Sequence, residues 1–162
     1  MDKDRSSKTF VVSGVTSGIG LALAQALAPT AGQLVIVGRD EAALQTASAL
    51  VASHGHGRLE LVPVLADLAT LAGSLSLAQR LDALPAIDVL VHNAGILPAH
   101  KKITSDGFEE SFAVNHVAPF VLNHFLRKRL MASAPSRVVQ VSAGLALHAS
   151  VDLDGDPRGA HF

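Results

Sequence analysis

The chain has 162 residues, of which 49% are hydrophobic and 17% charged, enough for one domain with a buried core and too apolar for a disordered chain. A net charge of −1 gives no electrostatic reason to bind nucleic acid or an anionic membrane, and no apolar run reaches the ~18 residues that span a bilayer. The absence of cysteine excludes disulfides and thiolate metal sites, and no apolar signal segment follows Met1, so we expect a cytoplasmic protein.

Strands and helices are predicted to alternate along the chain. Runs of Val, Ile and Leu predict five strands, at residues 9–14, 33–38, 58–64, 87–93 and 136–142. Apolar residues at helical spacing predict helices over 19–28, 40–53, 70–84 and 104–131. The last helix is expected in two pieces because of Pro119, and Pro63 indicates an edge strand or a bulge. Because the strands are continuously apolar, we expect both faces of the sheet to be covered.

This alternation predicts a Rossmann-like α/β fold with a doubly wound parallel sheet. About five strands are expected, in the order 3-2-1-4-5. Residues 9–144 would form the domain, after a flexible N-terminal tail of residues 1–8. Residues 145–162 are rich in Asp, Gly and Pro and have no period, so they are predicted to form a loop-like tail.

The first predicted strand leads directly into SGVTSGIG, residues 13–20, and then into a helix. Gly14 suits the sharp turn that leaves the strand, and Gly18 lets backbone N–H groups approach a pyrophosphate at the helix N-terminus. Gly20 permits the helix to pack closely on the strand. A glycine-rich turn without a ligand is the alternative. The strand before the glycines and the helix after them favour dinucleotide binding.

The end of the second predicted strand indicates which dinucleotide is bound. Sheets that bind NAD usually place an acid there for the ribose 2′-hydroxyl, whereas an Arg nearby accommodates a 2′-phosphate. This chain has Gly38 at that position and Arg39 after it, which favours NADP(H) over NAD(H). The alternative is that Arg39 is merely solvated. Asp40 is predicted to cap the next helix in either case.

Five short motifs occur in an order that resembles the short-chain dehydrogenase/reductase superfamily. They are SGVTSGIG at 13–20, ADL at 66–68, HNAG at 92–95, VNH at 114–116 and VSA at 141–143. The stretch over 106–143 most resembles the retinol dehydrogenase-like branch. The resemblance covers residues 9–144 and implies an oxidoreductase that transfers a hydride between NADP(H) and a small alcohol or carbonyl substrate. From the charge, the composition and the spacing of the histidines we expect no metal site, no nucleic-acid partner and no membrane partner.

The resemblance also implies a role for each matching residue. Cofactor binding would fall to residues of four segments: Ser13, Gly14, Thr16, Ser17, Gly18, Ile19 and Gly20 at the pyrophosphate, Arg39 at the ribose, Asp67 and Leu68 at the adenine, and Asn93, Ala94 and Gly95 beside the fourth strand. Two residues would be catalytic. Asn115 would kink its helix and hold a water, and Ser142 would position the substrate oxygen. His92 stands where the family more usually has Asn.

The family's general acid is a Tyr followed four residues later by a Lys, and this chain has no Tyr and no Lys after Lys128. The resemblance therefore indicates a form truncated or split before this motif, with a sheet that is incomplete on its C-terminal side. We expect negligible activity from the chain alone, and self-association or a partner that covers the open sheet edge. The alternatives are a non-catalytic dinucleotide-binding or partner-binding module, or proton donation by His148 or His161.

Overall fold

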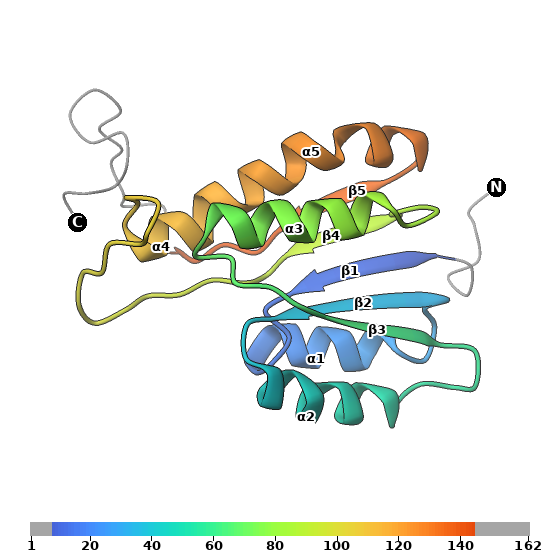
Figure 1. Cartoon of the computed structure of the whole chain (residues 1–162). Coiled ribbons are helices and arrows are strands. Elements are labelled where there is room, and N and C mark those ends of the chain that lie inside the picture. The colour runs from blue at the N-terminus through green and yellow to red at the C-terminus, as the bar shows by residue number, and fades with distance from the viewer. Residues whose placement is uncertain (1–7, 145–162) are drawn as a thin grey trace.

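A computed structural model describes residues 8–144, which form a parallel sheet with helices on both faces (Figure 1). The strands are β1 (Thr9–Ser13), β2 (Gln33–Gly38), β3 (Glu60–Leu65), β4 (Val89–His92) and β5 (Arg137–Gln140). Their order in the sheet is β3-β2-β1-β4-β5, and all neighbouring strands are parallel. The structure therefore confirms the predicted fold class and strand order. The predicted tail over 145–162 and residues 1–7 lie outside the described residues.

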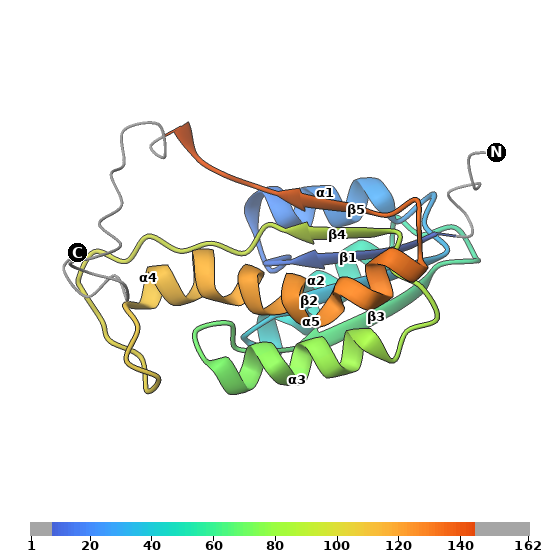
Figure 2. The same cartoon turned by 90° about the horizontal axis from the view of Figure 1, so that it is seen from above.

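The helices are distributed over the two faces of the sheet. Helices α1 (Gly18–Leu27) and α2 (Glu41–Ala52) cover one face, and α3 (Leu71–Asp82) and α5 (Ala118–Ala132) cover the other (Figures 1 and 2). Two of them begin at side-chain caps. Asp40 accepts a hydrogen bond from the Ala43 N–H at 2.8 Å, as predicted for a cap, and Thr70 accepts one from the Gly73 N–H at 3.0 Å.

The last predicted helix begins six residues later than its predicted start at 104. Residues 104–109 contain a turn in which Gly107 has a φ of +79°. Glu109 then caps the helix by accepting a hydrogen bond from the Phe112 N–H at 2.8 Å. The helix continues through α4 (Glu110–Phe112), a π-helical turn η2 (Ala113–Val117) and α5. Pro119 lies in the first turn of α5, where proline is tolerated. The two predicted pieces of the helix are α4 and α5, and the π-helical turn η2 joins them.

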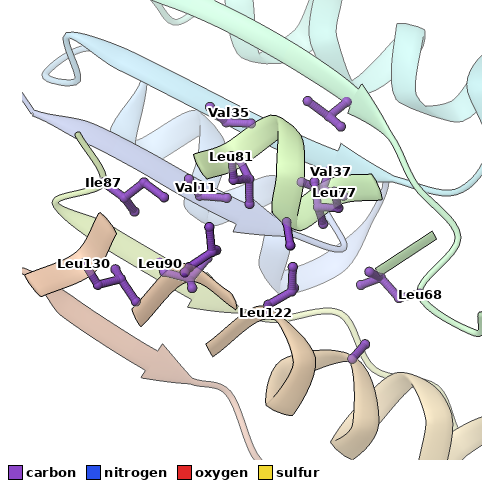
Figure 3. Close-up of a cluster of buried hydrophobic side chains, with 14 of the residues drawn as sticks. Val11, Val35, Val37, Leu68, Leu77, Leu81, Ile87, Leu90, Leu122 and Leu130 are labelled. Carbon is purple, nitrogen blue, oxygen red and sulfur yellow. The ribbon is translucent and has the colours of Figure 1, made fainter. Parts of the chain in front are cut away.

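Buried side chains form one hydrophobic layer on each face of the sheet. Figure 3 shows the layer beneath α3 and α5, where Val11, Leu90 and Leu122 pack together. The opposite layer lies beneath α1 and α2 and includes Val12 and Ile36. Neighbouring residues of β1 point to opposite layers because side chains alternate along a strand. The predicted coverage of both faces therefore holds for the central strands.

The prediction of two covered faces holds in part for the edge strand β3, where Val64 and Leu61 pack into the two opposite layers, and is wrong for β5. β3 is an edge strand, as Pro63 indicates, and Pro63 itself is exposed. All four residues of β5 are exposed, including Val138 at 46% and Val139 at 42%. These two valines point to opposite faces of the sheet, so β5 is uncovered on both faces.

Candidate functional site

A cavity of about 450 Å³ lies at the carboxyl ends of the strands, next to the neighbouring strands β1 and β4. After β1 the chain continues to α1 on one face of the sheet, and after β4 it continues to α5 on the other face. Ligands of open α/β sheets bind at this point of the topology. The cavity brings together segments that are far apart in the sequence. All of the predicted cofactor-binding residues except Ser13 line it: Gly14, Thr16, Ser17, Gly18, Ile19, Gly20, Arg39, Asp67, Leu68, Asn93, Ala94 and Gly95. Ile96, Val114 and Val141 complete its wall together with residues at the ends of β2 and β3.

The three glycines of the first loop have different surroundings. Gly14 has a φ of +70°, and a Cβ there would lie 2.7 Å from the Ala94 Cα. A Cβ on Gly20 would collide with the Gly14 carbonyl, because α1 begins directly against the end of β1. Around Gly18, whose φ is +55°, no atom lies within 4 Å of an added Cβ. Gly14 and Gly20 thus permit close backbone packing, while Gly18 leaves the helix N-terminus open to the cavity.

The N-terminus of α1 suits a bound anion. The Ser17 side chain makes no capping hydrogen bond, and the first turn contains no acidic residue. Backbone N–H groups in the first turn of a helix lack partners within the helix, and the helix dipole makes this end attractive to negative charge. Because Gly18, Ile19 and Gly20 all line the cavity, it fits the pyrophosphate of a dinucleotide.

Ser13 lies behind the cavity wall. Its hydroxyl accepts hydrogen bonds from the Asn93 and Ala94 N–H groups, both at 3.1 Å, and donates to the Val91 carbonyl at 3.3 Å. The Asn93 side chain donates in turn to the Ser13 and Gly14 carbonyls at 2.9 and 3.0 Å. Ser13 thus holds the turn after β4 against the end of β1, and its contact with the cavity runs through Asn93 and Ala94.

The rim near β2 carries the residues predicted to select the cofactor. Arg39 is exposed and lines the cavity directly after Gly38, the last residue of β2. A Cβ on Gly38 would lie 2.9 Å from the Thr16 Cγ2, so a side chain at this strand end requires Thr16 to move. Asp67 lies further along the rim. One of its carboxylate oxygens accepts a hydrogen bond from the Ala69 N–H at 3.0 Å.

Neither predicted catalytic residue lines the cavity, but each adjoins a residue that does. Asn115 is part of η2, and its side chain bonds both backbone groups of Ile96: Oδ1 accepts from the N–H, and Nδ2 donates to the carbonyl, each at 2.9 Å. Ile96 lines the cavity. Ser142 is exposed just after β5 and follows Val141, which also lines the cavity.

Sequence reasoning missed one buried polar pair next to the site. His92 is 2% exposed, and its Nε2 lies 2.9 Å from the Asn123 Oδ1 of α5. Burial lowers the pKa of His92, and the hydrogen bond to Asn123 opposes this shift in part. Because the Asn123 oxygen can only accept, we assign the neutral ring a proton on Nε2. Nothing in the sequence pointed to Asn123, since the pair forms only when α5 packs against β4.

Within residues 8–144, no group of three or more His, Asp or Glu side chains is arranged to hold a metal ion. None of the helices found there has the length and the apolar character needed to cross a membrane. His148 and His161, the alternative proton donors, lie outside this part of the chain.

The family model of short chain dehydrogenases matches residues 8–152. Human retinol dehydrogenase 13 is 33% identical over 152 residues, covering 91% of this chain and 44% of that protein. Bovine dehydrogenase/reductase SDR family member 13 is 38% identical over 148 residues, covering 91% of this chain and 38% of that protein. The chain thus spans less than half the length of these relatives.

Solved structures share the fold. A short-chain dehydrogenase from Sphingobium yanoikuyae in complex with NADPH aligns with a TM-score of 0.75 and 24% identity, over 87% of this chain and 56% of that one. A protein from Beutenbergia cavernae with NADP bound at low occupancy aligns with a TM-score of 0.73 and 30% identity, over 86% of this chain and 55% of that one. With its motifs, its sheet order and these relatives, the chain belongs to the short-chain dehydrogenase/reductase family and is similar to its retinol dehydrogenases.

Proposed function

We propose that the cavity binds NADP(H) and that the chain forms the cofactor-binding part of an oxidoreductase acting on an alcohol or carbonyl substrate. The observation that carries this proposal is the uncapped N-terminus of α1, which opens into a cavity at the carboxyl ends of the strands. The NADPH and NADP in the two aligned structures support a nicotinamide dinucleotide as the ligand.

Different residues of the cavity would bind different parts of the dinucleotide. The N–H groups of Gly18, Ile19 and Gly20 would bind the pyrophosphate. Asp67 has a carboxylate oxygen for the adenine amino group, and Leu68 would pack beside the ring. Ala94 and Gly95 would line the nicotinamide end, where Ser13 fixes the wall from behind.

Arg39 supports NADP(H) rather than NAD(H). The residue lines the cavity directly after β2, where its guanidinium could pair with a 2′-phosphate. The acid that would hold a 2′-hydroxyl is missing, because Gly38 occupies the strand end.

The bound nicotinamide would give or take a hydride, and the protein must hold the substrate oxygen and move a proton. Ser142 is our candidate for holding the oxygen by donating its hydroxyl hydrogen. Asn115 would act through Ile96, whose backbone it fixes at the cavity wall. A general acid needs a pKa near the working pH, and the chain has no Tyr to serve in this way. We therefore expect the proton donor in a further polypeptide segment.

A second candidate function follows from the same absence. Without its own general acid, the chain could act as a dinucleotide-binding or partner-binding module with no turnover. The uncovered β5 edge favours a polypeptide partner or self-association in either case. We also infer a cytoplasmic location from the lack of cysteine.

The direct test is a titration of NADPH with the chain, followed by the fluorescence of the nicotinamide because the chain has no Trp or Tyr. We expect saturable binding at one NADPH per chain, with weaker binding of NADH. Fluorescence that does not change with either cofactor at micromolar to millimolar protein would overturn the proposal. Aldehyde and ketone reduction by the same sample separates the two candidate functions.

A further inference from the structure

The end of β2 has no room for a side chain at Gly38. This residue lies beside the loop that joins β1 to α1 (Figure 1). A Cβ added to Gly38 would lie 2.9 Å from the Thr16 Cγ2, and the remaining atoms of Thr16 are farther away. Real Cβ atoms almost never come within 3.0 Å of another heavy atom. Gly38 has no positive φ, so the obstacle to a side chain is the Thr16 methyl group and not the backbone conformation.

The position of Thr16 is fixed by its own loop. The N–H groups of Gly14 and Val15 donate to the Val37 carbonyl at 2.9 and 3.3 Å, which fastens the loop to β2 one residue before Gly38. Val15 is fully buried, so it also holds the loop in place. A β-branched side chain has few χ1 rotamers to choose from. The methyl group of Thr16 is therefore held against the end of β2.

Leu44 of α2 closes the other side of Gly38 less tightly. Its Cδ1 would lie 3.3 Å from the added Cβ, a contact that a shift of a few tenths of an ångström relieves. Leu44 is buried, but this atom is the end of a flexible side chain. Thr16 therefore decides whether position 38 can carry a side chain.

No neighbouring carboxylate replaces the acid that is missing at the strand end. Asp40 follows closely, but it caps α2 by accepting a hydrogen bond from the Ala43 N–H at 2.8 Å, and it does not line the cavity. Among the cavity residues within 8–144, the only acid is Asp67, which follows β3. Position 38 is thus the place at the end of β2 where an acid would hold a ribose 2′-hydroxyl.

We propose that Thr16 is a specificity-determining residue of the cofactor cavity, because its methyl group keeps the end of β2 free of a side chain. The methyl excludes the strand-end acid that would favour NAD(H), and the space beside Arg39 stays open for the 2′-phosphate of NADP(H). Specificity then has two sources, the attraction by Arg39 and the exclusion of an acid at position 38. This role of Thr16 rests on the proposed binding of a nicotinamide dinucleotide.

A double-mutant cycle tests the contact without any cofactor. Gly38→Ala adds only the Cβ, and Thr16→Ser removes the methyl group and keeps the hydroxyl. We expect Gly38→Ala to lower the midpoint of urea denaturation in the unchanged chain, and to lower it less than about half as much in Thr16→Ser. Thr46→Ser is the matched control background, because Thr46 is exposed on α2 and is not among the nearest neighbours of the added Cβ. In that background the loss should equal the loss in the unchanged chain.

Titrations followed by nicotinamide fluorescence measure the effect on specificity. Gly38→Asp is made in the unchanged chain, in Thr16→Ser and in Thr46→Ser, and each product is compared with its own parent. We expect the NADH affinity to rise about tenfold in Thr16→Ser, where the new carboxylate can accept a hydrogen bond from the ribose 2′-hydroxyl. In the other two backgrounds it should not rise. Unfolding of Gly38→Asp in those two, with Thr16→Ser/Gly38→Asp folded, would also support the contact.

Three results would overturn the proposal. Gly38→Ala could cost as much stability in Thr16→Ser as in Thr46→Ser, which would show that the methyl group is no obstacle. Gly38→Asp could change the NADH affinity equally in all three backgrounds, which would remove Thr16 from the choice of cofactor. If neither cofactor binds to any parent, the proposed function fails and the specificity role fails with it, while the urea series still decides whether Thr16 closes the end of β2.

Discussion

Cofactor choice rests on two neighbouring residues at the rim of the cavity, Gly38 and Arg39. We predict that Arg39→Asp lowers the affinity for NADPH about 10- to 100-fold, because a hydrogen bond to a charged group contributes about 1.5–3 kcal/mol. The affinity for NADH should rise, since the new carboxylate can accept a hydrogen bond from the ribose 2′-hydroxyl. Paired titrations with both cofactors measure the change, with Arg80→Asp as the control. An unchanged ratio of the two affinities would show that Arg39 is merely solvated.

His92 predicts a dependence of stability on pH. Its pKa in the folded chain is lowered from the usual 6.5, so at acidic pH the unfolded chain binds more protons than the folded one. The stabilisation from neutral His92 is therefore complete above pH ~6.5 and is lost as the pH falls below that value. The free energy of unfolding should fall more steeply from pH 7 to 5 in the unchanged chain than in His92→Asn. Equal slopes in urea denaturation would contradict this account.

The residues that could be predicted from the sequence are those whose role is local. Gly14, Gly18 and Gly20 are recognisable because a turn from strand to helix requires glycine at those places. The contacts of two side chains could not be predicted. Ser13 turns toward β4 and not toward the cavity, and His92 meets Asn123, and both outcomes depend on how distant segments pack.

At the scale of elements, η2 and the loop after β4 form one unit through Asn115. We predict that Asn115→Ala destabilises the chain by about 0.5–1.5 kcal/mol, because both backbone groups of Ile96 lose this partner and must bond to water instead. NADPH affinity should fall as well, since Ile96 lines the cavity. Asn115→Asp keeps the oxygen that accepts from the Ile96 N–H and should be affected less. Urea denaturation that ranks the two variants in the opposite order would exclude this role.

The start of the long helix shows where periodicity misleads. Phe108 and Phe112 lie four residues apart and extend the apolar pattern back toward Thr104. Asp106 and Gly107 form a turn dipeptide that interrupts it, and Asp106 instead accepts a hydrogen bond from the Leu71 N–H at the start of α3. The Asp-Gly pair indicates a turn and Glu109 can cap a helix, and these two signals together predict the observed helix start.

At the scale of the whole molecule, the order of the sheet could be predicted because right-handed connections leave few arrangements for alternating strands and helices. The open edge of β5 is expected from the missing Tyr and Lys motif, whereas the composition of β5 does not indicate it, since Val138 and Val139 resemble the buried valines of β1. What covers a strand depends on neighbours that lie elsewhere in the fold.

The missing Tyr predicts the catalytic behaviour of the whole chain. We expect negligible reduction of aldehydes and ketones by the purified chain with NADPH, because no tyrosine can donate the proton. Absorbance at the nicotinamide band measures the rate. Steady turnover that persists after repurification and is lost in His148→Ala or His161→Ala would contradict this expectation and assign the proton to a histidine of residues 145–162.

The proposed binding of NADP(H) depends most on the N-terminus of α1 as the anion site, and Gly18→Asp tests this site directly. An added Cβ meets no atom within 4 Å at Gly18, and Asp tolerates a positive φ better than most residues, so the fold should persist. Gly57→Asp is the matched control, with a φ of +39° and the same open surroundings in a distant loop. We predict that Gly18→Asp weakens NADPH binding at least 100-fold through repulsion of the pyrophosphate, while Gly57→Asp binds as the unchanged chain does. Equal NADPH affinities for the two variants would contradict the account.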